Sequence, residues 1–261
     1  MTSCAGAADF ERTQPVSAIL PADINRGAVL GRKLCTSCHG VDGRGHGEAA
    51  DGLDLPPRDF VRAVYRYRST PTGSLPTDAD IARSITVGLP GTSMPGFGKL
   101  LSDRDVRDLV AWVKSFSPRF AIEEIDDPIV IPPPPEITAE TVVRGREVYE
   151  EMQCGKCHGE DGTGNGWASQ DDLRGPLGAY FRPRDFREGM YRSGLRQQDL
   201  YRTVVTGLDG TPMAAYEDTL PPEDVYSLVH YLLDLQQKRG FWFWLTHAPR
   251  WYEPTRVSVA R

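Results

Sequence analysis

The sequence predicts an all-α protein made of two related domains that a proline-rich segment joins. Apolar residues recur at helical spacing in the segment that closes the first half, at Val106, Leu109, Val110 and Val113. The alternation of apolar and polar residues that half-buried strands show is absent. A five-residue motif ending in Cys-His occurs in both halves, and many other residues repeat with it. Repetition at a long fixed offset indicates a duplicated domain.

The repeat is centred on Cys35-Thr36-Ser37-Cys38-His39 and Cys154-Gly155-Lys156-Cys157-His158, whose positions differ by 119 residues. The segment Pro57–Phe60 matches Pro183–Phe186 at an offset of 126 instead. The second half therefore has seven extra residues before this segment. The first half has seven extra residues after it, around Ser69 to Thr77, which return the offset to 119. A duplication followed by two compensating loop changes explains the pattern.

We expect five parts along the chain. They are an N-terminal tether (1–23), a first domain (24–117), a linker (118–137), a second domain (138–239) and an aromatic tail (240–261). The predicted helices run from 24 into the first motif, over 78–87 and over 102–116, then from 139 into the second motif, over 197–206 and over 222–237. Ser102 is a favourable N-cap for its helix.

The linker contains four consecutive prolines, Pro132 to Pro135. Such a run favours the polyproline II conformation and cannot lie inside a helix. A semi-rigid strap and an ordinary surface loop are both consistent with this composition.

The two motifs have the spacing of covalent haem attachment. In C-x-x-C-H, the two thiols add to the haem vinyl groups, and the adjoining His39 or His158 ligates the iron. A redox dithiol or a zinc site that uses all four cysteines is the alternative. Two copies, each followed by histidine and each opening a glycine-rich loop, favour two covalently bound haems c.

Two methionines are predicted to be the sixth ligands. Met94 follows His39 by 55 residues (94 − 39), and Met213 follows His158 by the same 55 (213 − 158). Met190 is the rival for the second haem, although the repeat aligns it with a valine. A filled sixth site suits electron transfer, because it leaves no open position for a substrate.

Histidine ligands are the other possibility for the sixth site. His46 and His230 have no histidine counterpart in the other half, so we expect each to be a surface or hydrogen-bonded residue. His247 lies in the tail, outside the repeat.

Other repeated residues suggest how a haem is held. Glycines such as Gly45 and Gly164 would let backbone approach the porphyrin, and a carbonyl of this loop would accept the Nδ1–H of the proximal histidine. Candidates for binding the haem propionates are Arg58, Tyr65, Arg66, Arg184, Tyr191 and Arg192; the alternative is an exposed arginine-rich turn with tyrosine in the core.

Each half resembles a class I cytochrome c domain, and the chain resembles dihaem cytochromes c made of two such domains in tandem. The matching residues are Cys35, Cys38, His39, Met94, Cys154, Cys157, His158 and Met213. The resemblance implies a periplasmic electron carrier, or one on the outer face of the bacterial inner membrane. Its expected partners are redox proteins, including a larger membrane-bound respiratory complex.

The ends of the chain lie outside this pattern. Small residues around Cys4 resemble a lipoprotein processing site, which would attach a lipid anchor; an incidental thiol is the alternative. The tail is rich in aromatic residues, from Phe241 to Tyr252, and is expected either to dock on a partner or to fold back.

The net charge of −6 shows no electrostatic footprint for nucleic acid. Three functions follow from the residues: an electron carrier, a dihaem enzyme (a peroxidase or a thiol-oxidising enzyme) with one exchangeable ligand, and a docking or assembly subunit. The duplicated methionines favour the carrier without independent catalysis.

Overall fold

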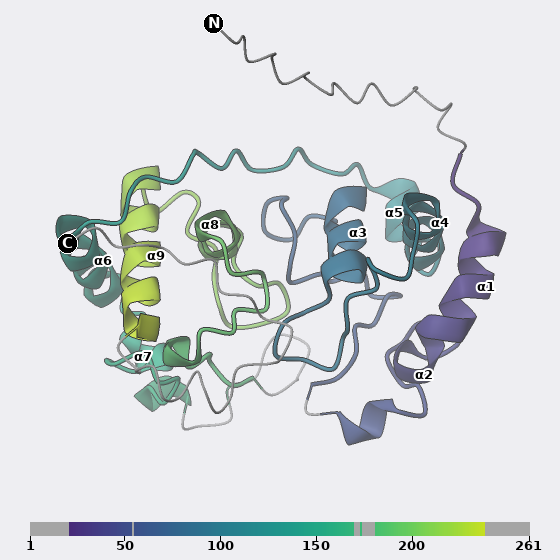
Figure 1. The fold of residues 1–261 in the computed structure, drawn as a ribbon, viewed down its shortest axis with the longest axis horizontal. Coiled ribbons are helices and arrows are strands. Elements are labelled where there is room, and N and C mark those ends of the chain that lie inside the picture. The colour runs from purple at the N-terminus through teal and green to yellow at the C-terminus, as the bar shows by residue number, and fades with distance from the viewer. Residues whose placement is uncertain (1–20, 54, 170–172, 174–180, 238–261) are drawn as a thin grey trace, which may run out of the picture.

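The computed structural model describes residues 21–53, 55–169, 173 and 181–237, and all regular secondary structure in that part of the chain is helical. The helices of the first half are α1 (Ile24–Leu34), α2 (Thr36–His39), α3 (Asp78–Val87), α4 (Asp103–Lys114) and α5 (Arg119–Ile122). Those of the second half are α6 (Ala139–Glu151), α7 (Gly155–His158), α8 (Gln197–Thr206) and α9 (Pro222–Gln237) (Figure 1). The predicted all-α class is confirmed. Cys4, His247 and the tail lie outside the described residues.

Local signals place most helix ends. The side chains of Thr77, Ser102 and Thr138 each accept a hydrogen bond from the amide three residues ahead, and so begin α3, α4 and α6. Two details differ from expectation. The cysteine motifs form separate single turns, α2 and α7, and the linker begins with the short helix α5, which was not predicted.

In each half a long helix near the start crosses a long helix near the end at a glycine: α1 crosses α4, and α6 crosses α9. A Cβ added to Gly27 of α1 would lie 2.0 Å from the carbonyl oxygen of Asp108 in α4. A Cβ added to Gly145 of α6 would lie 1.8 Å from the carbonyl oxygen of Ser227 in α9. Both crossings therefore bring backbone against backbone, which only glycine permits at this spacing.

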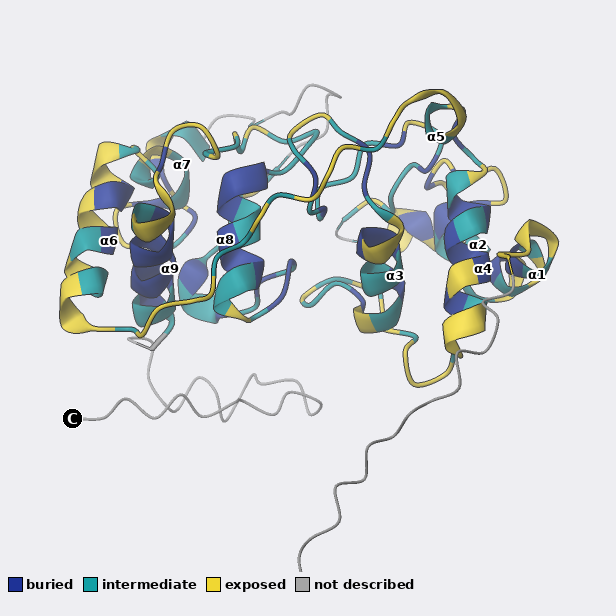
Figure 2. Cartoon of the chain, turned by 90° about the horizontal axis from the view of Figure 1, so that it is seen from above, coloured by how far each residue is buried: buried dark blue, intermediate teal, exposed yellow. Residues whose placement is uncertain are grey.

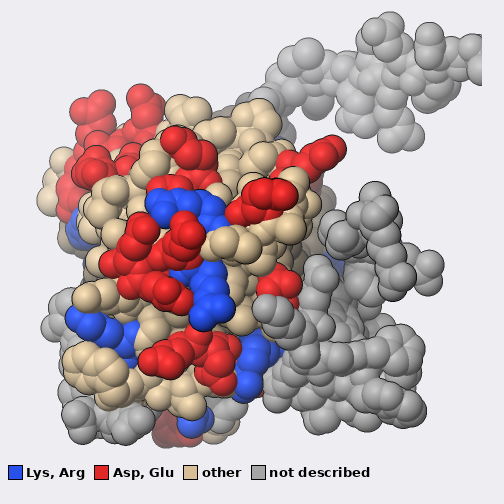
Figure 3. Space-filling model, turned by 90° about the vertical axis from the view of Figure 1, so that its left-hand side faces the viewer, with Lys and Arg blue, Asp and Glu red and all other residues tan. Residues whose placement is uncertain are grey.

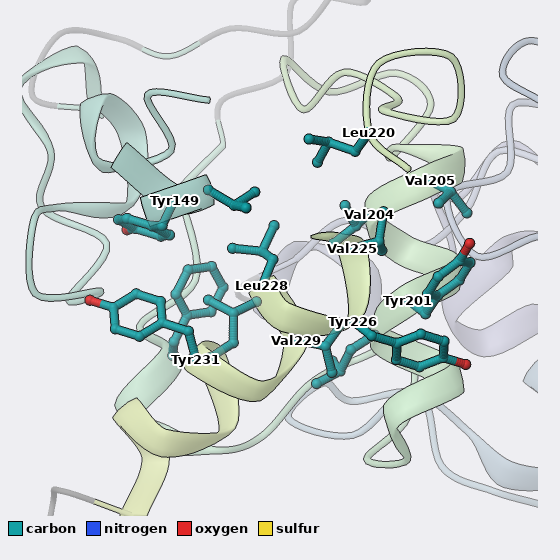
Figure 4. Close-up of a cluster of buried hydrophobic side chains, with 14 of the residues drawn as sticks. Tyr149, Tyr201, Val204, Val205, Leu220, Val225, Tyr226, Leu228, Val229 and Tyr231 are labelled. Carbon is teal, nitrogen blue, oxygen red and sulfur yellow. The ribbon is translucent and has the colours of Figure 1, made fainter. Parts of the chain in front are cut away.

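Each half has its own hydrophobic core on the inner faces of its helices (Figure 2). The second core is rich in tyrosine (Figure 4). Tyr149 and Tyr231 meet edge to face with ring centroids 5.4 Å apart, and the rings of Tyr201 and Tyr226 are 4.6 Å apart. Such pairs add to the stability that burial of the rings provides.

The linker crosses from α5 to α6 over both halves (Figure 1). The amide of Ile129 donates a hydrogen bond to the carbonyl of Ser69 at 2.8 Å in the first half. In the second half, the hydroxyl of Tyr226 donates to the carbonyl of Pro132, and Ile129 and Ile131 pack against the core. These contacts favour the strap over an unattached loop.

The seven extra residues of the first half lie at the boundary between the halves. Next to them, Arg68 is 1% exposed, donates to the carbonyl of Thr206 at 3.1 Å and pairs with Asp209 at 3.0 Å. The Thr72 hydroxyl also donates to the Thr206 carbonyl, at 2.7 Å. The insertion around 69–77 thus contacts the second half at the end of α8, where the methionine loop of that half begins.

The helices α3 and α8 face each other across the same boundary (Figures 1 and 2). Arg83 of α3 pairs with Asp199 of α8 at 2.9 Å, and the Asp199 side chain is 3% exposed. The two halves are therefore joined by buried polar contacts as well as by the linker.

The outer face of the second half interleaves acidic and basic side chains (Figure 3). On α6, Arg144 pairs with Glu151 and Arg146 with Glu150, both at 3.0 Å. This face has no single sign of charge that would attract a partner over long range. Among the described helices, none has the length and apolar character needed to cross a bilayer.

Candidate haem sites

The two motif histidines are oriented in the same way. His39 Nδ1 lies 3.0 Å from the carbonyl oxygen of Arg58, and His158 Nδ1 lies 3.2 Å from that of Arg184. A carbonyl only accepts, so Nδ1 carries the proton in each ring and Nε2 keeps its lone pair for a metal. The sequence predicted such a carbonyl, but within the glycine-rich loop; it comes from the repeated Pro-Arg-Asp-Phe segment further along.

An aromatic ring supports each of these imidazoles. Phe60 stacks on His39 and Phe186 on His158, each with ring centroids 4.4 Å apart. Burial lowers the pKa of both histidines, which keeps the rings neutral near pH 7. A neutral imidazole is the form that ligates iron.

The glycine-rich loops pack against the segments that supply these carbonyls. Gly45 has φ +83° and Gly164 has φ +76°, and a Cβ at either would lie 2.6 Å from the carbonyl oxygen of Pro57 or Pro183. Neither glycine lines the cavity of the second half. These two glycines therefore allow close packing of backbone on backbone, and the approach of the loops to a porphyrin stays a prediction.

A cavity of about 280 Å³ lies in the second half. Its walls include Cys154, Cys157, His158 and Met213, so the fold brings together all four residues that were predicted for this site. Much of the remaining wall is apolar, including Leu200, Val204, Phe186, Leu228 and Leu232.

Basic side chains also line this cavity. Arg66, Arg184 and Arg192 belong to its lining. Among the described residues, the Nε atoms of all three are buried without a hydrogen-bond partner. Arg184 also pairs with Glu188 at 3.2 Å. Buried nitrogen atoms without a hydrogen-bond partner are costly, so further anionic groups are expected beside these arginines. Thiols, an imidazole, a thioether, an apolar wall and arginines together fit a haem with its two carboxylates.

The methionine loops of the two halves share one geometry. The amide of Met94 donates to the Thr92 hydroxyl at 3.1 Å, and that of Met213 donates to the Thr211 hydroxyl at 3.1 Å. The structure thus repeats the loop as well as the sequence. In each half the methionine is half-buried.

The rival ligands lie elsewhere. Met190, the rival methionine, is not part of the cavity lining. A further methionine of the second half, Met152, is also outside the lining and packs against the second core. His230 is 0% exposed, and its ring nitrogens lie 2.7 Å from the Thr141 hydroxyl and 2.9 Å from the Gln197 side-chain oxygen. His230 is therefore a hydrogen-bonded core residue, as expected, and His46 is exposed.

The surroundings of the four half-buried motif cysteines do not favour redox or zinc chemistry. Burial raises the pKa of Cys35 and of Cys154 to about 11 each, whereas reactive dithiols have lowered values. Within the part of the chain that is described, the fold gathers no three His, Cys, Asp or Glu side chains into a metal-binding group.

Two site features were not found from the sequence. Arg66 and Tyr67 belong to the first half but line the cavity of the second. The repeat singled out Arg66 without indicating which half it serves, and Tyr67 carried no signal. Tyr191 lines the cavity, but its hydroxyl donates to the Leu232 carbonyl at 3.1 Å within the core, as the alternative for this tyrosine expects.

Comparison with known proteins identifies the family of the chain. A family model described as "Cytochrome C oxidase, cbb3-type, subunit III" matches twice, over residues 22–113 and 140–232. A chain of the reducing HAO-like protein complex of Kuenenia stuttgartiensis has a similar structure, with a TM-score of 0.78 and 34% identity over 81% of this chain and 96% of that one. The chain therefore belongs to this cytochrome c family and consists of two tandem c-type cytochrome domains of the electron-transfer kind.

Proposed function

We propose that this chain is a dihaem electron-transfer protein with two six-coordinate haems. His39 and Met94 would ligate the first iron, and His158 and Met213 the second. The observation that carries the proposal is the cavity in which Cys154, Cys157, His158 and Met213 meet. The first half repeats the histidine and methionine geometry of that site.

Haem supplies a one-electron iron couple, and the residues of the chain set its environment. The cysteines fix the position of the group, while Phe60 and Phe186 hold the imidazole planes. Apolar walls exclude water, which limits reorganisation when charge changes. A thioether ligand from Met94 or Met213 would raise the potential relative to a second histidine and, by filling the sixth position, would disfavour peroxidase chemistry.

Replacement of each methionine tests the assignment. Met94→Ala and Met213→Ala should each lower one midpoint potential and remove the iron–methionine charge-transfer band of one haem. Each opened iron should then bind added imidazole. Met190→Ala and Met152→Ala are matched controls that should change neither band. Two unchanged midpoints in the first pair, or a high-spin ferric haem in the unmodified protein, would contradict the proposal.

The proposal includes a location and a setting. Covalent haem attachment takes place outside the bacterial cytoplasm, so the periplasmic side of the inner membrane is proposed, with Cys4 as a lipid anchor. The Kuenenia chain belongs to a multi-protein redox complex, which supports redox protein partners here and a larger respiratory complex as the setting. Fractionation of cells that produce the protein or its Cys4→Ser variant tests the anchor; equal membrane recovery of both would count against it.

A further inference from the structure

One arginine of the first half reaches the site of the second. Arg66 follows the repeated Pro-Arg-Asp-Phe segment of the first half, yet it lines the cavity that contains His158 and Met213. Its guanidinium carbon lies 4.6 Å from the ring centroid of Phe181, which lines the same cavity. The neighbouring Tyr67 lines the cavity as well.

The charge of Arg66 is poorly compensated by its described neighbours. Its Nε is buried and has no hydrogen-bond partner among them. Burial and the like charges of Arg58 and Arg192 together lower the pKa of Arg66 to about 10, against the opposing effect of Tyr67. An anion in the same space would stabilise this half-buried cation against the like charges near it.

We infer that Arg66 is a binding residue of the second haem site, supplied across the domain boundary, and that it pairs with a carboxylate of that haem beside Arg192. This inference rests on the proposed function. A guanidinium matches a carboxylate in geometry and charge, and the phenyl ring of Phe181 holds its plane. The chain offers the same residue type from both halves, Arg192 from the second and Arg66 from the first.

A consequence is that the first domain sets the potential of the second haem. Reduction adds an electron to the site, and a nearby fixed cation stabilises that state in a medium of low dielectric constant. Arg68, two residues further on, ties this segment to Thr206 and Asp209 of the second half. The closed arrangement of the domains therefore keeps Arg66 at the second site.

The test uses the full-length haem-loaded protein with Arg66→Gln, Arg66→Lys and Arg62→Gln. Arg62 is the control, because its side chain is 55% exposed and pairs only at the surface, with Asp59. Spectroelectrochemistry measures both midpoints, and Met94→His and Met213→His backgrounds assign each midpoint to a haem. A thermal unfolding curve for each variant confirms that it is folded.

We expect Arg66→Gln to lower the midpoint potential of the second haem more than that of the first. Arg66→Lys keeps the positive charge and should leave the midpoint of the second haem close to that of the unmodified protein. Arg62→Gln should change neither midpoint. A shift that is equal or larger at the first haem, or no shift, would overturn the inference. If the Met→His backgrounds leave both midpoints unchanged, the ligand assignment fails instead, so the two failures are distinguishable.

Discussion

At the scale of single residues, the site depends on which nitrogens of each histidine ring take part in hydrogen bonds. His39 and His158 each give one nitrogen to a backbone carbonyl and keep the other for a ligand. His230 has both nitrogens engaged by Thr141 and Gln197. The same side chain is thus a candidate ligand in two places and a structural residue in the third, and the difference lies entirely in its partners.

The buried His230 predicts a dependence of stability on pH. Burial lowers its pKa, so the unfolded chain takes up a proton below its ordinary value of about 6.5 while the folded protein does not. Stability is therefore retained above that pH and falls as the pH drops below it. His230→Gln should lose less stability than the unmodified protein between pH 7 and pH 5 in urea unfolding. The exposed His46→Gln serves as control, and an unaltered slope in His230→Gln would refute this.

At the scale of elements, the helix crossings define each domain. The contacts of Gly27 with α4 recur in those of Gly145 with α9, and both crossings place the helix backbones in contact. Because the two domains share this crossing, the positions of the two motif histidines relative to the last helix are shared too. The geometry of the helix pair is therefore part of the site.

A methyl group at either crossing should separate the helices. Gly27→Ala and Gly145→Ala would each place a Cβ within about 2 Å of a carbonyl oxygen. We expect a loss of about 3 kcal/mol in the free energy of unfolding, the upper range for overpacked sites. Gly52→Ala is the matched control, because no described atom lies within 4 Å of its added Cβ. Similar denaturation midpoints for all three variants would disprove the crossing as the cause.

At the scale of the whole molecule, polar contacts join the two domains. Arg68 is buried against Thr206 and Asp209, beside the insertion around 69–77 that only the first half carries. The linker adds contacts to both halves, through Ser69 and Tyr226. The domains are therefore expected to behave as one body in solution.

Removal of the Arg68 charge should loosen this arrangement. Arg68→Gln leaves Asp209 without its buried partner, and breaking such a pair costs about 3 kcal/mol. We expect a larger radius of gyration in small-angle scattering and two separate thermal transitions. Arg62→Gln, at the exposed surface, should keep the compact profile. Identical scattering from both variants would argue against Arg68 as the joint.

Much of the fold could be predicted, because its causes are local. Helical spacing and caps such as Thr77 and Ser102 act within a few residues, and α3, α8 and α9 have the predicted bounds. The unpredicted helix α5 and the separate turns α2 and α7 show where local patterns are weakest. The repeat also predicted that His158 and Met213 belong to one site, because a duplicated domain keeps the spacing between its ligands.

The repeat alone therefore specified two helical domains, each with its cysteine motif, histidine and methionine. Only the tertiary structure decided that Arg58 and Arg184 supply the carbonyls, that the insertion around 69–77 joins the halves, and that Arg66 reaches the second cavity. The physical reason is that contacts between domains connect residues far apart in the chain. Contacts between domains produce no repeated spacing in a single sequence. Contacts within a duplicated domain occur twice, and their residues therefore have the same spacing in both halves.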